Sequence, residues 1–208
     1  MSKVNILLLG KAASGKDYSA KKLKELFGDK ANLVVSNTTR PKRRGEVDGV
    51  DYHFISLGKF FQKIDQNKML EYSQFNNWYY GTDEDALSGE INIAVVNIQG
   101  MESLIRNTFR SHSFIILVLC EPFWNRVIRY VRRSGFSFEM IRRFITDFLD
   151  FWGTSFWGNR PRRYKTMKVG KVYFKDLWND HNVVYLYLQS KDIEKYFDDI
   201  QYLAEAMI

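Results

Sequence analysis

The 208-residue sequence has only one cysteine, three histidines and three prolines. The single cysteine, Cys120, cannot form a disulfide within the chain, and its apolar, strand-like surroundings predict a buried thiol in a reducing compartment such as the cytoplasm. The histidines lack metal-ligand spacing, which argues against a histidine-based metal site. The scarcity of proline, with 45% apolar and 16% aromatic residues, excludes disordered and collagen-like proteins and predicts one globular domain over residues 1–208.

Long apolar runs are also absent from the sequence. The longest, such as Ile6 to Leu9 and Phe114 to Cys120, fall well short of the roughly 18 to 20 residues that cross a membrane. The N-terminus lacks the apolar segment and small-residue cleavage site of a signal peptide. We therefore expect a cytoplasmic protein with no membrane partner.

Acidic residues are in deficit, because 24 Asp and Glu stand against 31 Lys and Arg and leave a net charge of +7. This excess predicts an anionic partner, which means nucleic acid, a membrane surface or phosphorylated small molecules. The alternative for any one basic cluster is a solvated surface. The clusters are Arg40 to Arg44, Arg126 to Arg143 and Arg160 to Lys175.

Short apolar runs alternate with segments of helical periodicity, which is the pattern of an α/β protein. Continuous apolar runs are typical of parallel strands that helices cover on both faces. We predict a parallel central sheet flanked by helices, with an irregular basic stretch at 153–180. Strands are expected at 4–9, 33–36, 52–55, 79–82, 91–98, 114–119 and 183–188, and helices directly after residue 16 and at 58–67, 101–108, 123–133, 138–151 and 192–206.

Residues 10–16 read GKAASGK, the G-x-x-x-x-G-K core of a phosphate-binding loop, and they lie between a predicted strand and a predicted helix. Glycines let backbone N–H groups curl around phosphate oxygens, the start of the helix adds a favourable dipole, and Lys16 bridges the β and γ phosphates. The alternative is a structural glycine turn, which the strand and helix context disfavours. ATP is expected to contact Gly10, Ala13, Ser14, Gly15, Lys16 and Asp17.

Asp17 departs from the loop pattern, which places Ser or Thr after the lysine as a ligand of Mg²⁺. A carboxylate is also a hard oxygen ligand, so Asp17 is a candidate metal ligand. The alternative is that Asp17 only favours the helix N-terminus electrostatically.

Residues 35–56, VSNTTRPKRRGEVDGVDYHFIS, closely resemble guanylate kinases, which carry a similar Ser-x-Thr-Thr-Arg segment and a Gly-Glu-Val-x-Gly-x-Asp-Tyr stretch. The resemblance continues at residues 69–82, MLEYSQFNNWYYGT, and at Gln99 and Gly100. It implies a P-loop kinase fold with an inserted nucleotide-monophosphate-binding subdomain and a helical lid. The core would comprise 1–35, 91–122 and 180–208, the inserted subdomain 36–90, and the lid with a divergent basic insertion 123–179.

The same resemblance implies an acceptor site for GMP. Arginine forks bind phosphate oxygens bidentately, hydroxyl groups complete the donor shell, and a carboxylate accepts the N1–H and N2–H₂ donors of guanine. Each residue alone has an ordinary alternative as core filler, solvated charge or surface acid, but their joint order points to one site. By similarity, Ser36, Arg40, Arg43, Tyr52 and Tyr80 would hold the monophosphate with Glu46 orienting the arginines, Glu71 and Thr82 would read the base, and Gly81 and Asn97 complete the set.

Two residues depart from the family on the strand at 91–98, where similar enzymes carry an Asp-x-Asp pair. Val95 removes an acid that would help organise metal and lysine. Asn97 replaces a guanine acceptor with an amide, which both donates and accepts hydrogen bonds. Base specificity therefore stays open, and a kinase for a different nucleoside monophosphate is an alternative.

Arg132 and Arg143 have the eleven-residue spacing of two lid arginines that reach the donor phosphates in guanylate kinases, so both are candidate catalytic residues. Arginines that close onto ATP lower the barrier as an arginine finger does, although an exposed helical face is the alternative. Residues 152–178 have no clear family counterpart. Because no RNA-binding signature accompanies their basic and aromatic residues, we expect a solvated insertion and no nucleic-acid partner.

The implied activity is transfer of the γ-phosphate of ATP to GMP or dGMP, with Mg²⁺ as the metal. The acceptor is a phosphate monoester with a second pKa of about 6, so it is mostly dianionic at neutral pH and needs no catalytic base. The alternative is a binding module that has lost turnover and recognises a phosphorylated or acidic partner through Arg40, Arg43 and Tyr80. Asp17, Val95 and Asn97, which depart from the family pattern, favour this alternative. The intact phosphate loop opposes it, because a domain that only binds a partner does not need an ATP loop.

Overall fold

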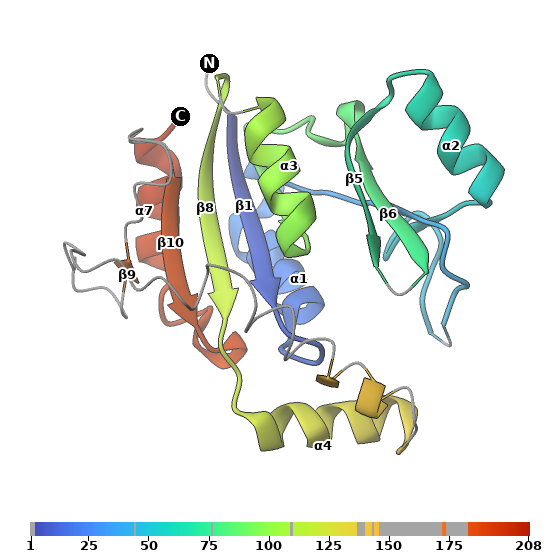
Figure 1. Ribbon diagram of the computed structural model, residues 1–208. Coiled ribbons are helices and arrows are strands. Elements are labelled where there is room, and N and C mark those ends of the chain that lie inside the picture. The colour runs from blue at the N-terminus through green and yellow to red at the C-terminus, as the bar shows by residue number, and fades with distance from the viewer. Residues whose placement is uncertain are drawn as a thin grey trace.

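The computed structural model describes residues 3–43, 45–75, 77–108, 110–136, 140–142, 144–145, 172–173 and 183–208. Within these ranges the larger of two β-sheets has six strands. Its strands are β1 (Lys3–Gly10), β2 (Ala31–Leu33), β7 (Ile91–Val95), β8 (His112–Leu119), β9 (Val172–Tyr173) and β10 (Val183–Leu188). They lie in the order β2-β7-β1-β8-β10-β9, and all neighbours are parallel except β10 with β9 (Figure 1).

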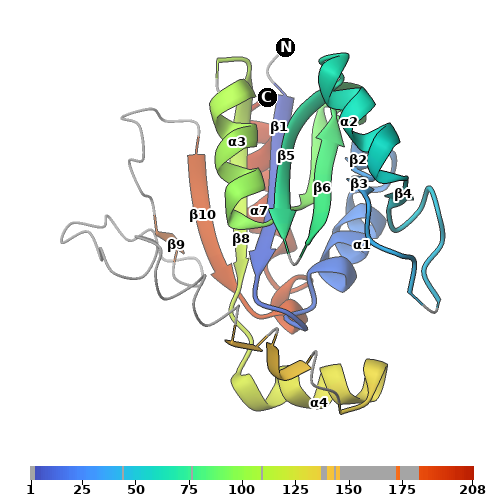
Figure 2. The same cartoon turned by 45° about the vertical axis from the view of Figure 1, so that its right-hand side comes forward.

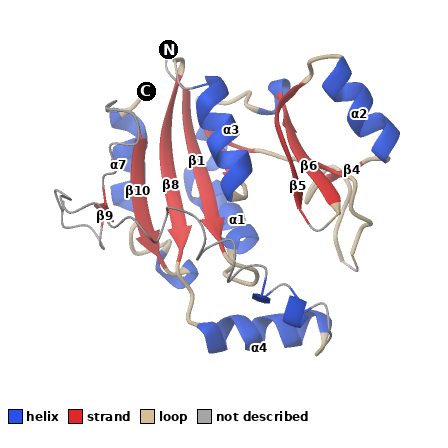
Figure 3. Ribbon diagram, in the orientation of Figure 1, coloured by secondary structure: helices blue, strands red, loops and turns tan. Residues whose placement is uncertain are grey.

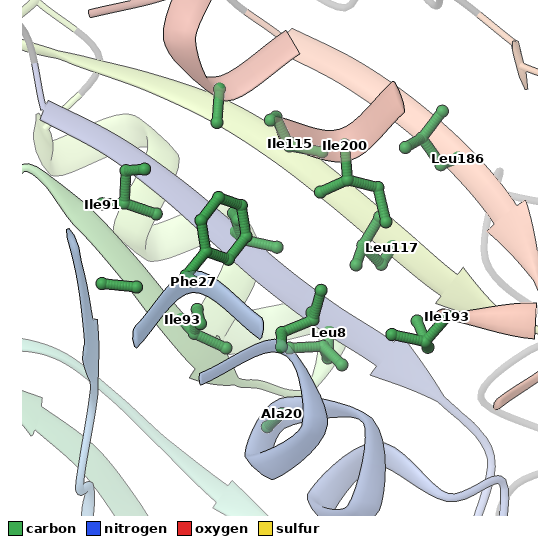
Figure 4. Packing of buried hydrophobic residues seen from close by; sticks show 14 of the residues in the cluster. Leu8, Ala20, Phe27, Ile91, Ile93, Ile115, Leu117, Leu186, Ile193 and Ile200 are labelled. Atoms are coloured by element: carbon green, nitrogen blue, oxygen red, sulfur yellow. The ribbon is translucent and has the colours of Figure 1, made fainter. Parts of the chain in front are cut away.

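Helices cover both faces of this sheet because its strands are apolar on both sides. The helices are α1 (Lys16–Phe27) and α7 (Phe197–Ala206) on one face and α3 (Ile98–Thr108) on the other (Figure 3). Leu8 packs in the cluster under α1 and α7, whereas its neighbour Leu7 packs in the cluster under α3. Figure 4 shows residues of the first cluster, in which Phe27 of α1 lies by Ile91 and Ile93 and Ile200 of α7 lies by Ile115.

The smaller sheet has four strands within the described residues and lies beside α3, which contacts β5 (Figure 2). Its order is β4-β3-β6-β5, with a helix, α2, packed on it through the fully buried Phe60. The elements are β3 (Asn37–Thr38), β4 (His53–Phe54), α2 (Leu57–Asp65), β5 (Met69–Phe75) and β6 (Trp78–Asp83). Four of the ten residues that the sequence assigns to the acceptor lie in this sheet, namely Glu71, Tyr80, Gly81 and Thr82, and five more lie just before β3 or in the segment between β3 and β4.

A further helix, α4 (Phe123–Ser134), follows β8 and lies beyond the carboxyl ends of β1 and β8 (Figures 1 and 2). In parallel sheets ligands bind at these carboxyl ends. The phosphate loop, which joins β1 to α1, is located at the same edge. The topology therefore places α4 next to the loop.

The predicted α/β arrangement is confirmed, with differences in detail. The second strand begins at Ala31, before the predicted 33–36, and α3 begins at Ile98 instead of residue 101. Strands β3 and β5 were not predicted, because β3 has only two residues, both polar, and the apolar residues of β5 do not alternate regularly with polar ones. Both strands pair with β6. The prediction of a buried Cys120 is wrong: its side chain is exposed, since it lies one residue past the end of β8.

The predicted helix at 138–151 and the predicted irregular stretch at 153–180 lie largely outside the described residues. One part of that stretch was predicted wrongly, because Val172 and Tyr173 form β9 through antiparallel pairing with β10. The predicted closing helix starts later than residue 192, since a 3₁₀ turn at Ser190–Asp192 precedes α7. Across the part of the chain that the structure describes, no helix has the length and apolar character that crossing a membrane requires.

Candidate functional site

The phosphate loop joins the buried strand β1 to α1 by a backbone path that restricts side chains. Gly15 has φ +91°, and a Cβ atom there would lie 2.8 Å from Cβ of Ser190, so only glycine fits. Ala13 adopts a left-handed conformation with φ +59° although it is not a glycine. Nζ of Lys16 donates to the carbonyl oxygens of Gly10 at 2.7 Å and Lys11 at 3.2 Å. The lysine thus lies over its own loop, at the positive end of the α1 dipole.

Two interactions connect α1 with the segment that leads into β4. Asp17 is exposed in the first turn of α1, and its charge adds to burial in raising the pKa of Tyr52. One turn further, Nζ of Lys21 donates to Oδ1 of Asp51 at 2.9 Å. The phosphate loop and the residues assigned to the acceptor phosphate therefore lie on facing parts of the molecule.

A buried ion pair organises the basic segment after β3. Arg40 donates through both Nη atoms to the two carboxylate oxygens of Glu46, at 2.9 and 2.8 Å, and its side chain is only 6% exposed. The guanidinium also lies 5.5 Å from the ring centre of Tyr52. Burial of Glu46 opposes ionisation, but the hydrogen bonds from Arg40 and from the Arg43 backbone N–H lower the pKa of Glu46. Glu46 thus binds the side chain of Arg40 and the backbone of Arg43, and its role in orienting the arginines toward a phosphate stays a prediction.

The tyrosines assigned to the acceptor phosphate lie beside this pair. The rings of Tyr52 and Tyr80 meet edge to face, with centroids 6.1 Å apart. Gly81 follows on β6, where a Cβ atom would lie 2.9 Å from the carbonyl oxygen of Glu71. The close approach of β5 and β6 therefore requires glycine at this position.

A buried carboxylate lies at the centre of the predicted base-reading group. Glu71 is 6% exposed, and its Oε1 accepts a hydrogen bond of 2.7 Å from Oγ1 of Thr82, its partner across β5 and β6. The hydroxyl of Ser36 lies 3.3 Å from that of Thr82. Burial raises the pKa of Glu71, and the hydrogen bond from Thr82 opposes the rise. One carboxylate and two hydroxyls therefore converge, although they come from three separate strands and loops.

Asn97 adjoins this group and is held at both ends of its amide. Its Oδ1 accepts from the N–H of Gly100 at 2.7 Å, and its Nδ2 donates to Oγ of Ser73 at 2.9 Å. A Cβ atom on Gly100 would lie 2.9 Å from Oε2 of Glu71 and 3.1 Å from Oδ1 of Asn97. The backbone of Gly100 therefore separates the two polar side chains. Val95, the other departure, is half-buried against the apolar core.

Helix α4 contributes two arginines to the loop that the sequence did not single out. Nε of Arg126 donates to the carbonyl oxygen of Ala12 at 2.9 Å. Nη1 of Arg129 donates to Oγ of Ser190 at 3.1 Å, and the Ser190 hydroxyl in turn donates to Glu121 at 2.6 Å. Only their spacing in the sequence could have indicated a shared role, because residues three apart lie on the same side of a helix.

The two arginines that the sequence did single out have no established place in the site. Arg132 is exposed near the end of α4, and Arg143 lies outside the described residues. Their catalytic role stays a prediction. Within the described ranges, no group of three or more His, Cys, Asp and Glu side chains is arranged to hold a metal ion.

The chain is similar in sequence and in fold to known guanylate kinases. The profile of the family described as guanylate kinase matches residues 2–122, more than half of the chain. The guanylate kinase of Helicobacter pylori strain 26695 is 41% identical over 106 residues, which are 48% of this chain and 51% of that protein. For Blochmanniella floridana the identity is 35% over 114 residues, 52% and 53% of the two chains. The chain thus spans about half the length of these two curated relatives in the matched regions.

Other relatives match over a greater length at lower identity. The guanylate kinase of Mycoplasmoides gallisepticum is 28% identical over 203 residues, covering 95% of this chain and 90% of that protein. The crystal structure of guanylate kinase from Anaplasma phagocytophilum superposes with a TM-score of 0.56 and 19% identity, over 99% of this chain and 86% of that one, and supports the fold alone. The family profile confirms the resemblance that the sequence suggests, and the chain belongs to the guanylate kinase family.

Proposed function

We propose that this protein is an ATP-dependent nucleoside monophosphate kinase that transfers the γ-phosphate of ATP to GMP or dGMP in the cytoplasm. The observation that carries the proposal is the buried carboxylate of Glu71, which accepts a hydrogen bond from Thr82 in the smaller sheet. The phosphate-binding candidates Arg40 and Tyr52 lie in the segment between β3 and β4 of the same sheet. That segment is joined to α1, the helix after the phosphate loop, through the ion pair of Lys21 with Asp51. These contacts support a donor site at the loop and an acceptor site opposite it.

On the acceptor side, the carboxylate of Glu71 would accept the N1–H and N2–H₂ donors of guanine. The hydroxyl of Thr82 holds Oε1 from one side, which leaves the carboxylate with one orientation. Arg40, Arg43 and the tyrosine hydroxyls would bind the monophosphate oxygens. The amide of Asn97 does not choose sharply between a donor and an acceptor on the base, so guanine preference rests on Glu71.

On the donor side, backbone N–H groups of the loop and the ammonium group of Lys16 would bind the β and γ phosphates of ATP. An oxygen of the GMP phosphate attacks the γ-phosphorus, the bond to the bridging β–γ oxygen breaks, and ADP and GDP are formed. No catalytic base is needed, because the acceptor phosphate is already mostly dianionic. The protein's task is to align two anions in line and to screen their repulsion.

Mg²⁺ fits this site only together with the nucleotide phosphates. Asp17 offers one exposed carboxylate at the start of α1, and the described residues provide no three-ligand cluster around it. One carboxylate is enough for Mg²⁺, which is usually held by one or two carboxylates and substrate phosphates. When bound, the ion would screen and orient the phosphate oxygens. The alternative is that Asp17 only favours the N-terminus of α1, worth about 0.3 to 1 kcal/mol.

A coupled assay of ADP release with GMP, dGMP, AMP and IMP tests the proposed function. We expect turnover with GMP or dGMP, and calorimetric ATP binding that is stronger with Mg²⁺ than without it. Asp17→Asn should reduce this metal dependence, because a carboxylate beside a triphosphate is repulsive unless a divalent ion lies between them. ATP binding without turnover on any acceptor would favour the binding module instead. Equal metal dependence in both proteins would reject Asp17 as a ligand.

We also expect GMP affinity to fall in mildly acidic solution because of Glu71. Burial raises the pKa of Glu71, so as the pH falls through this raised value the carboxylate takes up a proton, and one of its two acceptor oxygens becomes a donor that opposes the N–H donors of guanine. Below that pKa the dissociation constant of GMP should rise by up to about tenfold per pH unit. Calorimetric titrations between mildly acidic and neutral pH measure the effect.

Glu71→Gln is the matched control, since the phosphate of GMP titrates identically in both proteins. At neutral pH this variant should bind GMP more weakly by about 1 to 3 kcal/mol, with a flatter pH profile. AMP affinity should change little. Identical pH profiles, or equal losses for GMP and AMP, would contradict base reading by Glu71.

A further inference from the structure

Arg126 connects α4 with the phosphate loop through a backbone atom. Its Nε donates to the carbonyl oxygen of Ala12 at 2.9 Å, and the residue is only 5% exposed. Its guanidinium also lies 4.6 Å from the ring centre of Phe144. An arginine enclosed to this degree has lost most of its rotamer freedom, so its donor atom holds a fixed position.

Holding the carbonyl of Ala12 also fixes the N–H of Ala13. The peptide bond between them is planar and trans, so its C=O and N–H point in opposite directions. The hydrogen bond from Arg126 thus directs the Ala13 N–H away from α4. A phosphate loop binds anions by the direction of its successive N–H groups, and rotation of one peptide would present a carbonyl oxygen in place of a donor.

The backbone conformation of Ala13 is a reason for the loop to need the hydrogen bond from Arg126. Its φ of +59° lies in the left-handed region, which is unfavourable for residues that carry a Cβ atom. Such conformations persist only where the surrounding structure determines them. Ser14 N–H bonds the carbonyl of Lys11 at 3.2 Å on one side of the strained residue, and Arg126 holds the preceding peptide.

The beginning of α4 is itself anchored to the other end of the loop. Glu121, whose side chain is 1% exposed, accepts from the N–H and hydroxyl of Ser190 at 2.8 and 2.6 Å. Arg129 donates to the same hydroxyl. Ser190 lies against Gly15, because a Cβ on Gly15 would fall 2.8 Å from its Cβ. Arg126 thus bonds the loop directly at Ala12, whereas Glu121 and Arg129 bond Ser190, which lies against Gly15.

We propose that Arg126 is a positioning residue for the donor nucleotide, which holds the peptide between Ala12 and Ala13 in the orientation that binds the phosphates of ATP. The hydrogen bond from Nε, and not the positive charge, is the part that acts. This inference rests on the proposed kinase function for turnover, but ATP binding reports on it separately.

Three substitutions separate the hydrogen bond from the charge. In Arg126→Gln, Nε2 is the same number of bonds from Cα as Nε of arginine, so the variant keeps a donor there and loses the charge. Arg126→Lys keeps the charge and has a carbon at that position. Arg126→Ala keeps neither. Calorimetry with ATP and with GMP, kinetics with varied ATP, and thermal unfolding are measured for each variant.

The Lys and Ala variants are expected to raise the dissociation constant and the KM for ATP about tenfold, which is within the usual effect of losing one hydrogen bond. The Gln variant should stay within about threefold of the wild type, and kcat should change less than KM. GMP affinity should stay unchanged in all three. If the Ala variant does not fold, comparing the ATP affinities of the Gln and Lys variants still shows whether the hydrogen bond or the charge acts.

Two results would overturn the proposal. Near-normal ATP binding by the Lys variant with weak binding by the Gln variant would mean that the charge acts on the phosphates. Parallel losses of ATP and GMP affinity in all variants would mean a general structural role. If the wild type binds ATP but phosphorylates no monophosphate, the proposed function fails, while the ATP-binding series still tests Arg126.

Discussion

Replacing Lys16 with alanine is expected to lower the rate of phosphoryl transfer at least about 100-fold while leaving GMP affinity near the wild-type value. A charge aligned on the transferring phosphate acts mainly in the transition state, where negative charge on the bridging and terminal oxygens grows. Lys16 is the first residue of α1, and its ammonium group already lies over the loop, bonded to the carbonyls of Gly10 and Lys11. Little reorganisation is then needed when phosphates arrive.

Single-turnover kinetics with saturating ATP and GMP measure this loss apart from binding. Lys24→Ala is the matched control, because it removes the same charge two turns further along α1, where the side chain only bonds the carbonyl of Gly28. The control should stay within about twofold of the wild-type rate, as expected for a screened surface charge. A Lys16 variant with nearly full turnover would show that the loop does not bind the transferring phosphate.

Glu46→Ala is expected to lower the free energy of unfolding by about 3 kcal/mol, because it leaves the buried Arg40 without its carboxylate partner. The pKa of Glu46 is lowered in the folded protein, so its stabilisation is present above the ordinary glutamate pKa and is lost as the pH falls through the lowered value. The difference between wild type and variant should therefore be full at neutral pH and shrink in strong acid.

Urea unfolding at neutral and acidic pH measures this difference. Glu25→Ala removes a carboxylate that is 68% exposed and pairs with Lys22 on the surface, and it should cost under about 1 kcal/mol. Because the GMP phosphate can supply Arg40 with a new anionic partner, GMP should raise the melting temperature of the Glu46 variant more than that of the wild type. Equal costs for both substitutions would mean that Arg40 is satisfied without Glu46.

The phosphate loop was readable from the sequence because its chemistry is local: seven consecutive residues provide the glycines, the lysine and the helix start. The acceptor group depended on the resemblance, since Glu71 and Thr82 meet only through the register of β5 against β6. The sequence of β5, MLEYSQF, does not alternate regularly between apolar and polar residues, so that register could not be derived from it. The strands predicted at 4–9, 114–119 and 183–188 agree with β1, β8 and β10 to within two residues, whereas the strand predicted at 91–98 ends at Val95.

Helix α4 does not follow the usual rule that the apolar residues of an amphipathic helix are buried and its charged residues exposed. Periodicity would bury its apolar residues, yet Trp124 is 71% and Ile128 49% exposed, whereas Arg126 is 5% exposed. The reason lies outside the helix, because the carbonyl of Ala12 and the ring of Phe144 provide partners for a buried guanidinium. The sequence of residues 123–134 does not indicate these partners, because they come from other parts of the chain. The burial of Arg126 was therefore not predicted, and Arg132 was singled out instead.

The bridge between Lys21 and Asp51 has a further consequence for how the two substrates influence each other. Its lysine is 50% exposed and its aspartate 21%, so the bridge contributes under about 1 kcal/mol. An ion pair with so small a free energy favours the approach of the segment before β4 to α1, but it breaks readily at ordinary temperature. Any coupling between the affinities of donor and acceptor that passes through it must be reciprocal, and dissolved salt must weaken it. We therefore expect higher ionic strength to weaken any such coupling.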